Sequence, residues 1–328
     1  MSAERLPQFV IAGAPKAGTT ALHAALATHP GLYLSPVKEP KFYLTDGRPP
    51  PARTQRGPGD AHSAQEWVWR RDRYLDLFRR APADAVRGES TPFYLYDRAA
   101  QRRLVADVPD VKVIAVVRDP VDRAVSNWVH LRADGLEPEA DFGRAVALED
   151  ERVAAGWAPF WHYTRMGRYG EQLRNLLTLV PREQLLLLRF REVVAEQART
   201  LDRVSAFLGV ATGVARAVPA ENVKPYVADP PRSRRLARLA RAGAAAGAHV
   251  PPQVWRQAGR PLLTALHAGA TERPPLPVEV RRAVLARVLD DIALLEEVTG
   301  ESFEDWRGDT GRGDYASRAA AREADSGA

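Results

Sequence analysis

The hydrophobic pattern of the chain alternates between short apolar runs and stretches with helical spacing. Continuous apolar runs at residues 8–13, 111–117 and 185–188 predict strands that are buried on both faces of a sheet, and a shorter strand is expected at 85–88. Helices are predicted at 20–28, 63–80, 96–107, 120–133, 141–156, 166–179, 193–208 and 278–298. Strands that alternate with helices predict an α/β fold, with a central parallel β-sheet flanked by helices.

Two segments depart from this alternation and set the expected domain limits. Residues 230–275 contain prolines, an Ala/Arg tract and two apolar patches, and we expect them to form a mostly helical insertion. Residues 307–328 have almost nothing to bury, so a disordered tail is expected there. The sequence therefore predicts a single domain over residues 1–306.

Composition narrows the classes of function. None of the 328 residues is cysteine, which excludes a thiolate metal site or a Cys nucleophile and fits a reducing compartment. No apolar run approaches the ~20 residues of a membrane span, and residues 1–7 show no signal-peptide core, so we expect a cytoplasmic protein. The net charge of +6 permits an anionic ligand, but a nucleic-acid partner is not expected without a denser basic stripe.

The segment Gly13-Ala-Pro-Lys-Ala-Gly-Thr-Thr20 joins a predicted buried strand to a helix. Such a loop aims backbone N–H groups and the positive end of the helix at one point, which makes an anion site. A Walker A loop would have lysine directly after its second glycine. Here Thr19 follows Gly18 and the lysine stands earlier, at Lys16, so phosphate binding is favoured and an ordinary nucleotide hydrolase is not.

A second motif follows the strand at 111–117 and reads Arg118-Asp-Pro-Val-Asp-Arg-Ala-Val-Ser126, in which Asp119 can cap a helix and Pro120 can begin it. Together the two motifs resemble the signatures of sulfotransferases that use 3′-phosphoadenosine-5′-phosphosulfate (PAPS). The ending Thr-Gly-Glu-Ser-Phe-Glu-Asp-Trp306 is similar to that of bacterial members. The resemblance implies a P-loop-like three-layer fold, an enzyme that transfers a sulfuryl group, and PAPS as its co-substrate.

The resemblance also implies which residues hold PAPS. Lys16, Ala17, Gly18, Thr19 and Thr20 would bind its 5′ side, and Lys16 would also stabilise the leaving group. Arg118 and Ser126 would bind the 3′-phosphate. Arg273 is a further candidate, in a proline-rich stretch that faintly resembles the loop closing over that phosphate. No cluster of residues has metal-ligand spacing, and no metal is predicted.

Two further segments suggest the acceptor side. Glu39-Pro-Lys41-Phe-Tyr resembles the stretch that carries the catalytic glutamate in the glycosaminoglycan-type branch, closest to the heparan sulfate enzymes, so Glu39 is the candidate general base. Gly88-Glu89-Ser-Thr-Pro-Phe-Tyr94 resembles another motif of that branch, with Ser90 in place of its lysine; Lys41 and Glu89 are candidate substrate contacts. A salt bridge from Glu39 to a neighbouring lysine would give the same pattern, and a histidine is the competing base, although none of the seven histidines lies in a motif that matches.

The acceptor itself stays open between a glycan, a glycolipid, a secondary metabolite or another small molecule with a hydroxyl or amine. Five tryptophans could line its cleft or belong to the core: Trp67, Trp69, Trp128, Trp157 and Trp161. The basic helix at 232–241 could contact an anionic membrane surface, but docking of its leucines on the domain is the favoured interpretation. Two alternative functions remain, a small-molecule phosphotransferase that needs Mg²⁺ and a non-catalytic anion-binding module.

Overall fold

The central feature of the molecule is a five-stranded parallel sheet. The computed structural model describes residues 5–50, 57, 67–219, 226–227, 235–236, 238–239, 242, 261, 270–271 and 274–309. The strands are β1 (Phe9–Gly13), β2 (Leu32–Leu34), β3 (Val86–Ser90), β4 (Lys112–Val117) and β5 (Leu185–Arg189), in the spatial order β2-β3-β1-β4-β5. Every neighbouring pair is parallel, which confirms the predicted α/β fold with a central parallel sheet.

Strands β1 and β4 are apolar because both of their faces are covered. Each residue of β1 and of β4 after Lys112 is buried. Gly88 of β3 shows how closely the strands pack, since a Cβ at that position would lie 2.2 Å from Cζ of Phe9 on the neighbouring strand. A side chain there would displace the phenyl ring, so glycine is required at this point of the sheet.

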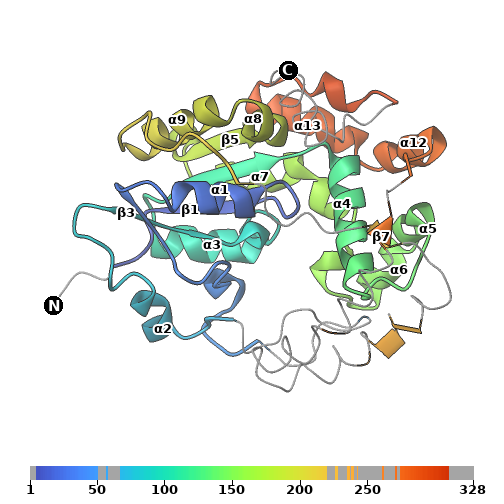
Figure 1. Ribbon diagram of the computed structural model, residues 1–328, viewed down its shortest axis with the longest axis horizontal. Coiled ribbons are helices and arrows are strands. Elements are labelled where there is room, and N and C mark those ends of the chain that lie inside the picture. Colours follow the sequence, from blue (N-terminus) through green and yellow to red (C-terminus); the bar gives the residue numbers. More distant parts are fainter. Residues whose placement is uncertain are drawn as a thin grey trace.

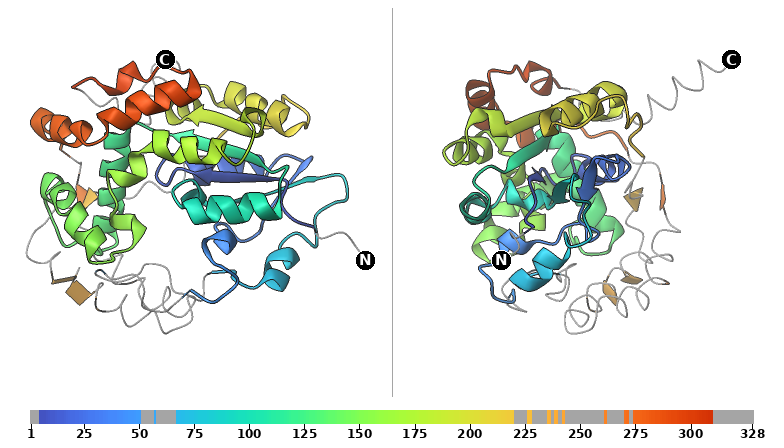
Figure 2. Two further views of the ribbon diagram at one scale, coloured as in Figure 1. Left: turned by 180° about the vertical axis from the view of Figure 1, so that it is seen from behind. Right: turned by 90° about the vertical axis from the view of Figure 1, so that its left-hand side faces the viewer.

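Helices cover both faces of the sheet. In chain order they are α1 (Thr19–Leu26), α2 (Arg71–Asp76), α3 (Arg98–Asp107), α4 (Pro120–Ala133), α5 (Phe142–Ala147), α6 (Glu149–Ala154), α7 (Tyr169–Leu177), α8 (Phe190–Ala195), α9 (Gln197–Leu208), α12 (Val278–Ala286) and α13 (Leu289–Thr299). Helix α1 lies in front of the sheet in Figure 1, and the view from behind shows α3 and α7 over the opposite face (Figure 2). The three layers of a P-loop-like fold are therefore present.

The structure corrects several predicted boundaries. Strand β2 had no clear signal because it is only three residues long, and α2 occupies only residues 71–76 of the helix expected over 63–80. Three predicted helices are each divided in two, at 141–156, 193–208 and 278–298. The last division has a visible reason: it brings Asp291 to the start of α7, where its carboxylate accepts hydrogen bonds from the amides of Gly170 and Glu171.

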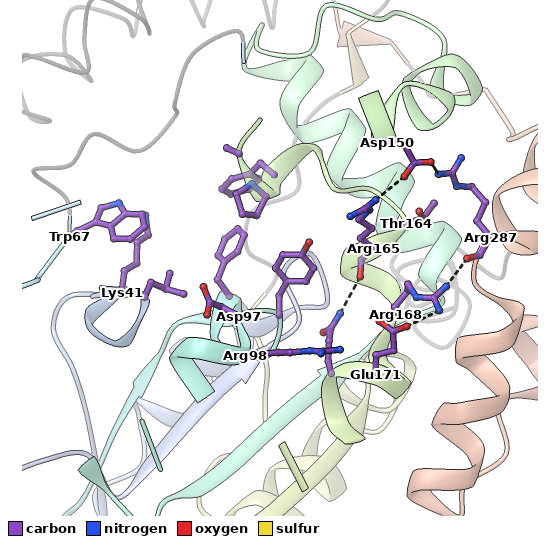
Figure 3. Close-up of a pocket in the computed structure, with 17 residues that line it drawn as sticks. Lys41, Trp67, Asp97, Arg98, Asp150, Thr164, Arg165, Arg168, Glu171 and Arg287 are labelled. Carbon is purple, nitrogen blue, oxygen red and sulfur yellow. Dashed lines mark hydrogen bonds and ion pairs between the residues drawn. The ribbon is translucent and has the colours of Figure 1, made fainter. Parts of the chain in front are cut away.

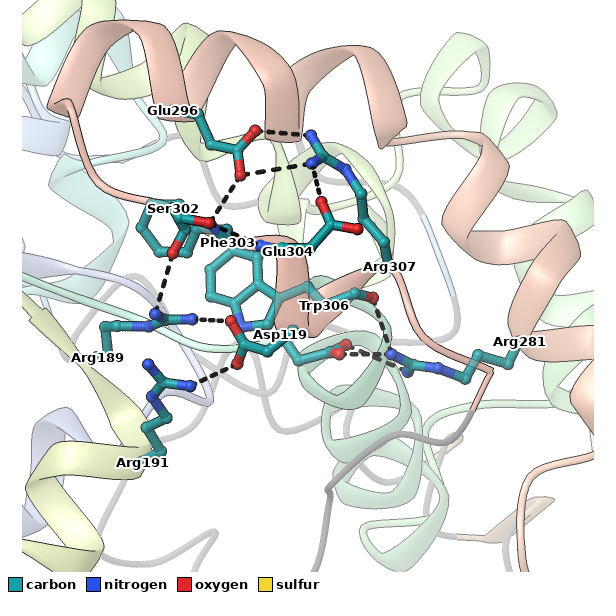
Figure 4. Close-up of polar contacts among 11 residues, drawn as sticks. Asp119, Arg189, Arg191, Arg281, Glu296, Ser302, Phe303, Glu304, Trp306 and Arg307 are labelled. Atoms are coloured by element: carbon teal, nitrogen blue, oxygen red, sulfur yellow. Dashed lines mark hydrogen bonds and ion pairs between the residues drawn. The ribbon is translucent and has the colours of Figure 1, made fainter.

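The C-terminal part of the described chain is fastened to the start of α4. Asp119 caps α4 as predicted, accepting from the amides of Val121 and Asp122, and Pro120 is the first helical residue. Arg281, whose side chain is 2% exposed, donates to Asp119 Oδ2 at 2.6 Å and to the carbonyl oxygen of Trp306 at 3.1 Å (Figure 4). Residues near the C-terminal end of the described chain therefore stabilise the start of α4, which directly follows Arg118.

Some predicted segments lie largely outside the described residues. Most of the insertion expected at 230–275, including most of the basic helix at 232–241, and the tail beyond residue 309 are not described. Within the described part, β6 (Tyr226–Val227) and β7 (Ala270–Thr271) form a short antiparallel pair at the borders of the insertion. None of the described helices is both long and apolar enough to cross a membrane.

Candidate active site

The loop between β1 and α1 places the predicted anion-binding residues at the carboxyl end of the sheet, where open α/β proteins bind ligands. Gly18, with φ +86°, is the N-cap residue of α1, and it has no side chain with which to cap the amides of the first turn. Amides at the start of a helix are donors suited to a phosphate or sulfate group. Lys16 has φ +69°, a left-handed conformation that non-glycine residues rarely adopt. The backbone of this loop therefore fits an anionic group.

The predicted 3′-phosphate arginine lies directly beside this loop. Arg118 follows β4, the neighbour of β1 in the sheet, and its Nη1 donates to the carbonyl oxygen of Lys16 at 3.3 Å. Its guanidinium stacks over the ring of Phe190, 4.6 Å from the ring centre. The same ring faces Gly18, because a Cβ on that glycine would lie 2.9 Å from Cε2 of Phe190. The two sequence signatures, about a hundred residues apart, thus meet on one aromatic ring.

One face of α4 continues the site away from Arg118. Ser126 and His130 are one helical turn apart and both are half-buried, so they share that face. His130 Nδ1 lies 3.2 Å from Lys16 Nζ, and its Nε2 lies 3.4 Å from Asp134 Oδ2. This contact shows that the face of α4 carrying Ser126 is turned toward the loop, as the predicted 3′-phosphate contact requires.

Glu39 lies on a short irregular segment after β2. It and Lys41 have φ values of +60° and +61°, and together with Lys16 they are the non-glycine residues of positive φ in the described part of the chain. The amide of Glu39 donates to the carbonyl oxygen of Ser90 at 2.9 Å, while its carboxylate forms an ion pair with Lys38. Backbone strain of this kind gathers at functional sites, although the ion pair itself is what a purely structural role would also produce.

The buried carboxyl group of Glu89 holds the segment that carries Glu39 and Lys41 through a set of hydrogen bonds. Its side chain is fully buried and accepts hydrogen bonds from the hydroxyls of Tyr74 at 2.9 Å, Tyr94 at 2.8 Å and Thr91 at 2.7 Å. The Thr91 hydroxyl also accepts from the amide of Lys41, and the Tyr94 hydroxyl accepts from the amide of Tyr43. Burial raises the pKa of Glu89 to about 7, against the lowering effect of the three hydroxyls. Its carboxyl group holds the Glu39 segment in place; a direct contact with substrate stays a prediction.

Ser90, which replaces the lysine of the resembling motif, is bound by a histidine. His23 Nδ1 lies 2.8 Å from the Ser90 hydroxyl, and that hydroxyl belongs to a fully buried residue. Burial, with a smaller effect of the nearby Lys38, lowers the pKa of His23 to about 4, so the ring is neutral at pH 7. His23 is near enough to Glu39 for that carboxylate to affect its pKa, but its ring carries no charge at pH 7.

A cavity of about 720 Å³ opens beside Lys41 and extends toward α6, α7 and the region between α12 and α13. Figure 3 shows Lys41 and Trp67 on one side and Arg165, Arg168 and Arg287 on the other. Lys41 Nζ lies 5.4 Å from the Trp67 ring centre, a cation–π contact. Phe160, which also lines the cavity, stacks on His130 and so connects the cavity wall to Lys16.

The basic side chains of the cavity outnumber the acidic ones. The basic residues are Lys41, Arg98, Arg165, Arg168 and Arg287, and the acidic ones are Asp97, Asp150 and Glu171. Asp150 bridges Arg165 and Arg287, and Arg168 pairs with Glu171 and with Asp290. These ion pairs hold Arg165, Arg168 and Arg287 in place on this wall.

The described residues predicted from sequence form two groups, which His23 of α1 and Ser90 of β3 connect. Direct contacts join the β1–α1 loop to Arg118 and to α4, while Glu39, Lys41 and Glu89 belong to a hydrogen-bonded unit that extends from the Lys38–Glu39 pair to the cavity. Arg273 lies outside the described residues. Among the residues that are described, no group of three or more His, Asp or Glu is placed to hold a metal ion.

Sequence reasoning did not single out His130 or Phe190. His130 follows Ser126 by four residues, so helical spacing alone could have placed it on the binding face. Phe190 directly follows β5, whose end lies beside the end of β4. Of the five candidate tryptophans, Trp67 lines the cavity, whereas Trp128 and Trp161 are core residues with 5% and 1% exposure.

The chain is similar in sequence and in structure to known proteins. Residues 7–213, more than half of the chain, match the model described as "Sulfotransferase family". Human heparan sulfate glucosamine 3-O-sulfotransferase 3B1 is 30% identical over 208 residues, which is 63% of this chain and 47% of that protein. The human bifunctional heparan sulfate N-deacetylase/N-sulfotransferase 2 is 28% identical over 217 residues, 63% of this chain and 22% of that protein. The chain thus matches less than half the length of these relatives.

A solved structure extends the similarity to nearly the whole chain. The crystal structure of a sulfotransferase from Alicyclobacillus acidocaldarius is 26% identical and superposes with a TM-score of 0.70, over 93% of this chain and all of that one. This match confirms the fold class predicted from the sequence.

Proposed function

Because the chain belongs to the sulfotransferase family, we propose that it transfers the sulfuryl group of PAPS to a hydroxyl or amine of an acceptor bound in the 720 Å³ cavity. The observation that carries this proposal is the meeting of Lys16 and Arg118, with Arg118 Nη1 3.3 Å from the carbonyl oxygen of Lys16. A single nucleotide that carries a 5′-phosphosulfate and a 3′-phosphate would bind Lys16 through the first group and Arg118 through the second. A small-molecule phosphotransferase would instead place Lys directly after Gly18.

The donor would lie across the carboxyl ends of β1 and β4. The amides at the start of α1 and the hydroxyls of Thr19 and Thr20 would hold its 5′ side, together with Lys16 and the backbone at Ala17 and Gly18. Arg118 and Ser126 would hold the 3′-phosphate. Arginine matches the planar arrangement of phosphate oxygens better than lysine does, which supports Arg118 in this role. We retain Arg273 as a further candidate contact.

In the proposed reaction the acceptor oxygen or nitrogen attacks sulfur while the bond from sulfur to the 5′-phosphate oxygen breaks. The proton of the acceptor passes to the carboxylate of Glu39, and the products are a sulfated acceptor and 3′,5′-ADP. Lys16 neutralises the charge that develops on the leaving oxygen. Glu89 fixes the backbone of the segment that carries Glu39 and Lys41 through Thr91 and Tyr94. The reaction depends mainly on positioning and electrostatics.

A saccharide or another polyhydroxylated molecule with a negative group suits the cavity best, since Lys41 and Trp67 form one wall and arginines the other. The heparan sulfate relatives support a glycan acceptor, and glycolipids or secondary metabolites remain within the same class. The lack of cysteine in all 328 residues supports action in a reducing compartment, such as the cytoplasm of a bacterium. We propose residues 1–306 as one catalytic domain.

Turnover of PAPS with a panel of sugar acceptors, followed by mass spectrometry of the products, tests the proposal. We expect an added SO₃ on an acceptor and release of 3′,5′-ADP without a divalent ion. Glu39→Gln should reduce kcat by about 10²- to 10⁴-fold and leave the affinity for 3′,5′-ADP unchanged. The matched control is Lys38→Met, which breaks the ion pair but keeps the carboxylate. An active Lys38→Met beside an inactive Glu39→Gln assigns the loss to the carboxylate. If Glu39→Gln is fully active, Glu39 is not the base.

A further inference from the structure

The contact between Lys16 and His130 joins two parts of the site that are 114 residues apart in sequence. The Lys16 ammonium lies 3.2 Å from His130 Nδ1. The side chain of His130 is 24% exposed, so the ring lies at the border between the site and the protein interior. His130 belongs to neither of the sequence signatures that assign the other residues of the site.

The donors and acceptors of the two groups decide which nitrogen of His130 carries the proton. An ammonium group has hydrogen-bond donors and no acceptor. The contact with Lys16 therefore requires an unprotonated Nδ1, and the ring proton is then on Nε2. That nitrogen faces Asp134 Oδ2 at 3.4 Å, at the C-terminal end of α4. The carboxylate thus favours the tautomer in which Nδ1 can accept from lysine.

The ring of His130 also stacks on an aromatic ring. The Phe160 ring is nearly parallel to it, at an interplanar angle of 8° and with 6.3 Å between the ring centres. Phe160 in turn lines the 720 Å³ cavity. Asp134 and Phe160 together leave the imidazole little freedom to rotate, so its Nδ1 is a fixed acceptor for a long and flexible lysine side chain.

From this arrangement we propose that His130 is a positioning residue that holds the Lys16 ammonium at the point where the leaving oxygen of the donor develops charge. The inference rests on the proposed function. A lysine side chain has four rotatable carbon–carbon bonds, and its electrostatic effect on a transition state depends on where its charge is held. The expected consequence of losing the acceptor is a lower kcat, with little change in the binding of donor or acceptor.

Two variants of the same shape test this role. Leucine and asparagine have the same branching and similar size, but only asparagine offers an oxygen acceptor near the position of Nδ1. We expect His130→Leu to lower kcat by about 10- to 100-fold, and His130→Asn to stay within about threefold of the wild type. The KM for the acceptor and the Kd for 3′,5′-ADP should change by less than about threefold in both. The control His29→Asn removes a buried histidine that contacts Ala211 and Gly31, and it should lower stability but not kcat.

A second readout does not depend on catalysis. The chain contains only five lysines, at positions 16, 38, 41, 112 and 224, so NMR spectra of protein with labelled lysine side chains are simple enough to assign, using Lys16→Arg to identify the signal of Lys16. We expect the Lys16 side-chain signal to shift in His130→Leu and to return toward its wild-type position in His130→Asn. The signal of Lys112, which donates to the carbonyl oxygen of Phe207, should not move.

The two readouts separate the inference from the function on which it rests. Wild-type kcat in His130→Leu, equal losses in His130→Leu and His130→Asn, or a Lys16 signal that is the same in every variant would each overturn the role of His130. If the wild-type protein neither transfers a sulfuryl group nor binds 3′,5′-ADP, the proposed function fails and so does the catalytic role of His130, while the NMR spectra still decide whether His130 holds Lys16.

Discussion

The guanidinium of Arg118 rests on the ring of Phe190, with 4.6 Å between the guanidinium carbon and the ring centre. Because the same ring fills the space beside Gly18, it connects the ends of three neighbouring parts of the fold: the loop after β1, the end of β4 and the start of α8. The two proposed phosphate sites are therefore held at a fixed separation by one aromatic side chain.

Replacing Phe190 should weaken donor binding. Phe190→Leu removes a cation–π contact of about 0.5–2 kcal/mol and frees Arg118 to move, so we expect the Kd for 3′,5′-ADP to rise by about 3- to 30-fold in calorimetric titrations. Phe207→Leu is the matched control, since Phe207 also lies under a cation, Lys112, at 5.5 Å. Equal affinity in the Phe190 variant and the wild type would show that the ring does not position Arg118.

A methyl group at Gly18 should distort the loop between β1 and α1 and so weaken donor binding. Gly18→Ala places a Cβ 2.9 Å from the Phe190 ring at a residue with φ +86°, so the loop or the ring must move. We expect at least a tenfold loss of affinity for 3′,5′-ADP, by the same titration. Gly209→Ala introduces a similar backbone strain at φ +79° with nothing within 4 Å. If both variants lose stability but neither loses affinity, the close fit at Gly18 has no part in binding.

Stability should fall with rising pH because of Glu89. Its pKa is raised by burial to about 7 in the folded protein, from an ordinary value of 4.5. The folded state thus binds the proton more tightly, and the contribution of Glu89 to stability is full below pH 4.5 and is lost as the pH rises through 7. The pKa of His23 is lowered to about 4, so this residue has the opposite effect. Its contribution to the stability of the protein is full above pH 6.5 and is lost as the pH falls through 4.

The Glu89→Gln variant separates these effects, because it keeps His23 and removes the titrating carboxyl group. We expect the free energy of unfolding of the wild type, relative to the variant, to decrease between pH 5 and pH 8 by roughly 1–3 kcal/mol. Urea unfolding at several pH values measures this difference. A constant difference across that range would mean that Glu89 does not titrate there.

The ion pair between Arg281 and Asp119 should be important for stability. Side-chain exposure is 2% for Arg281 and 11% for Asp119, and Arg281→Met leaves the carboxylate at the start of α4 with one partner fewer. We expect a loss of about 3 kcal/mol in the free energy of unfolding. The neighbouring Arg282 is exposed and pairs with Asp309, so Arg282→Met should cost less than about 0.5 kcal/mol. Similar losses in the two variants would contradict this.

The sheet and most helices could be predicted because their signals are local. The runs at 8–13 and 111–117 are apolar at nearly every position, as strands buried on both faces must be, and Asp119 with Pro120 marks the start of α4 by chemistry that acts within a few residues. Strand β2 is too short to give a local signal. The division between α12 and α13 could not be predicted because it depends on a distant contact, the bond from Gly170 to Asp291.

The site was predictable where residues repeat a motif and unpredictable where they only meet in space. Lys16, Gly18 and Arg118 belong to two sequence signatures, and the order of strands in a parallel sheet brings those together. Phe190 and the wall of arginines in the cavity belong to no motif. Their positions follow from which strands and helices are neighbours, and the sequence does not state that order. The role of Glu89 as an anchor depends on three hydroxyls that surround it from several elements.

Calorimetric titration of the protein with 3′,5′-ADP, in EDTA, tests the central claim most directly. In the proposed donor site Arg118 and Ser126 bind the 3′-phosphate, which ADP and ATP lack, and a charged hydrogen bond is worth about 1.5–3 kcal/mol. We therefore predict binding of 3′,5′-ADP that is at least about tenfold tighter than binding of ADP or ATP and unchanged by added Mg²⁺. Equal affinity for ADP, or binding that requires Mg²⁺, would contradict the proposed donor site and with it the proposed reaction.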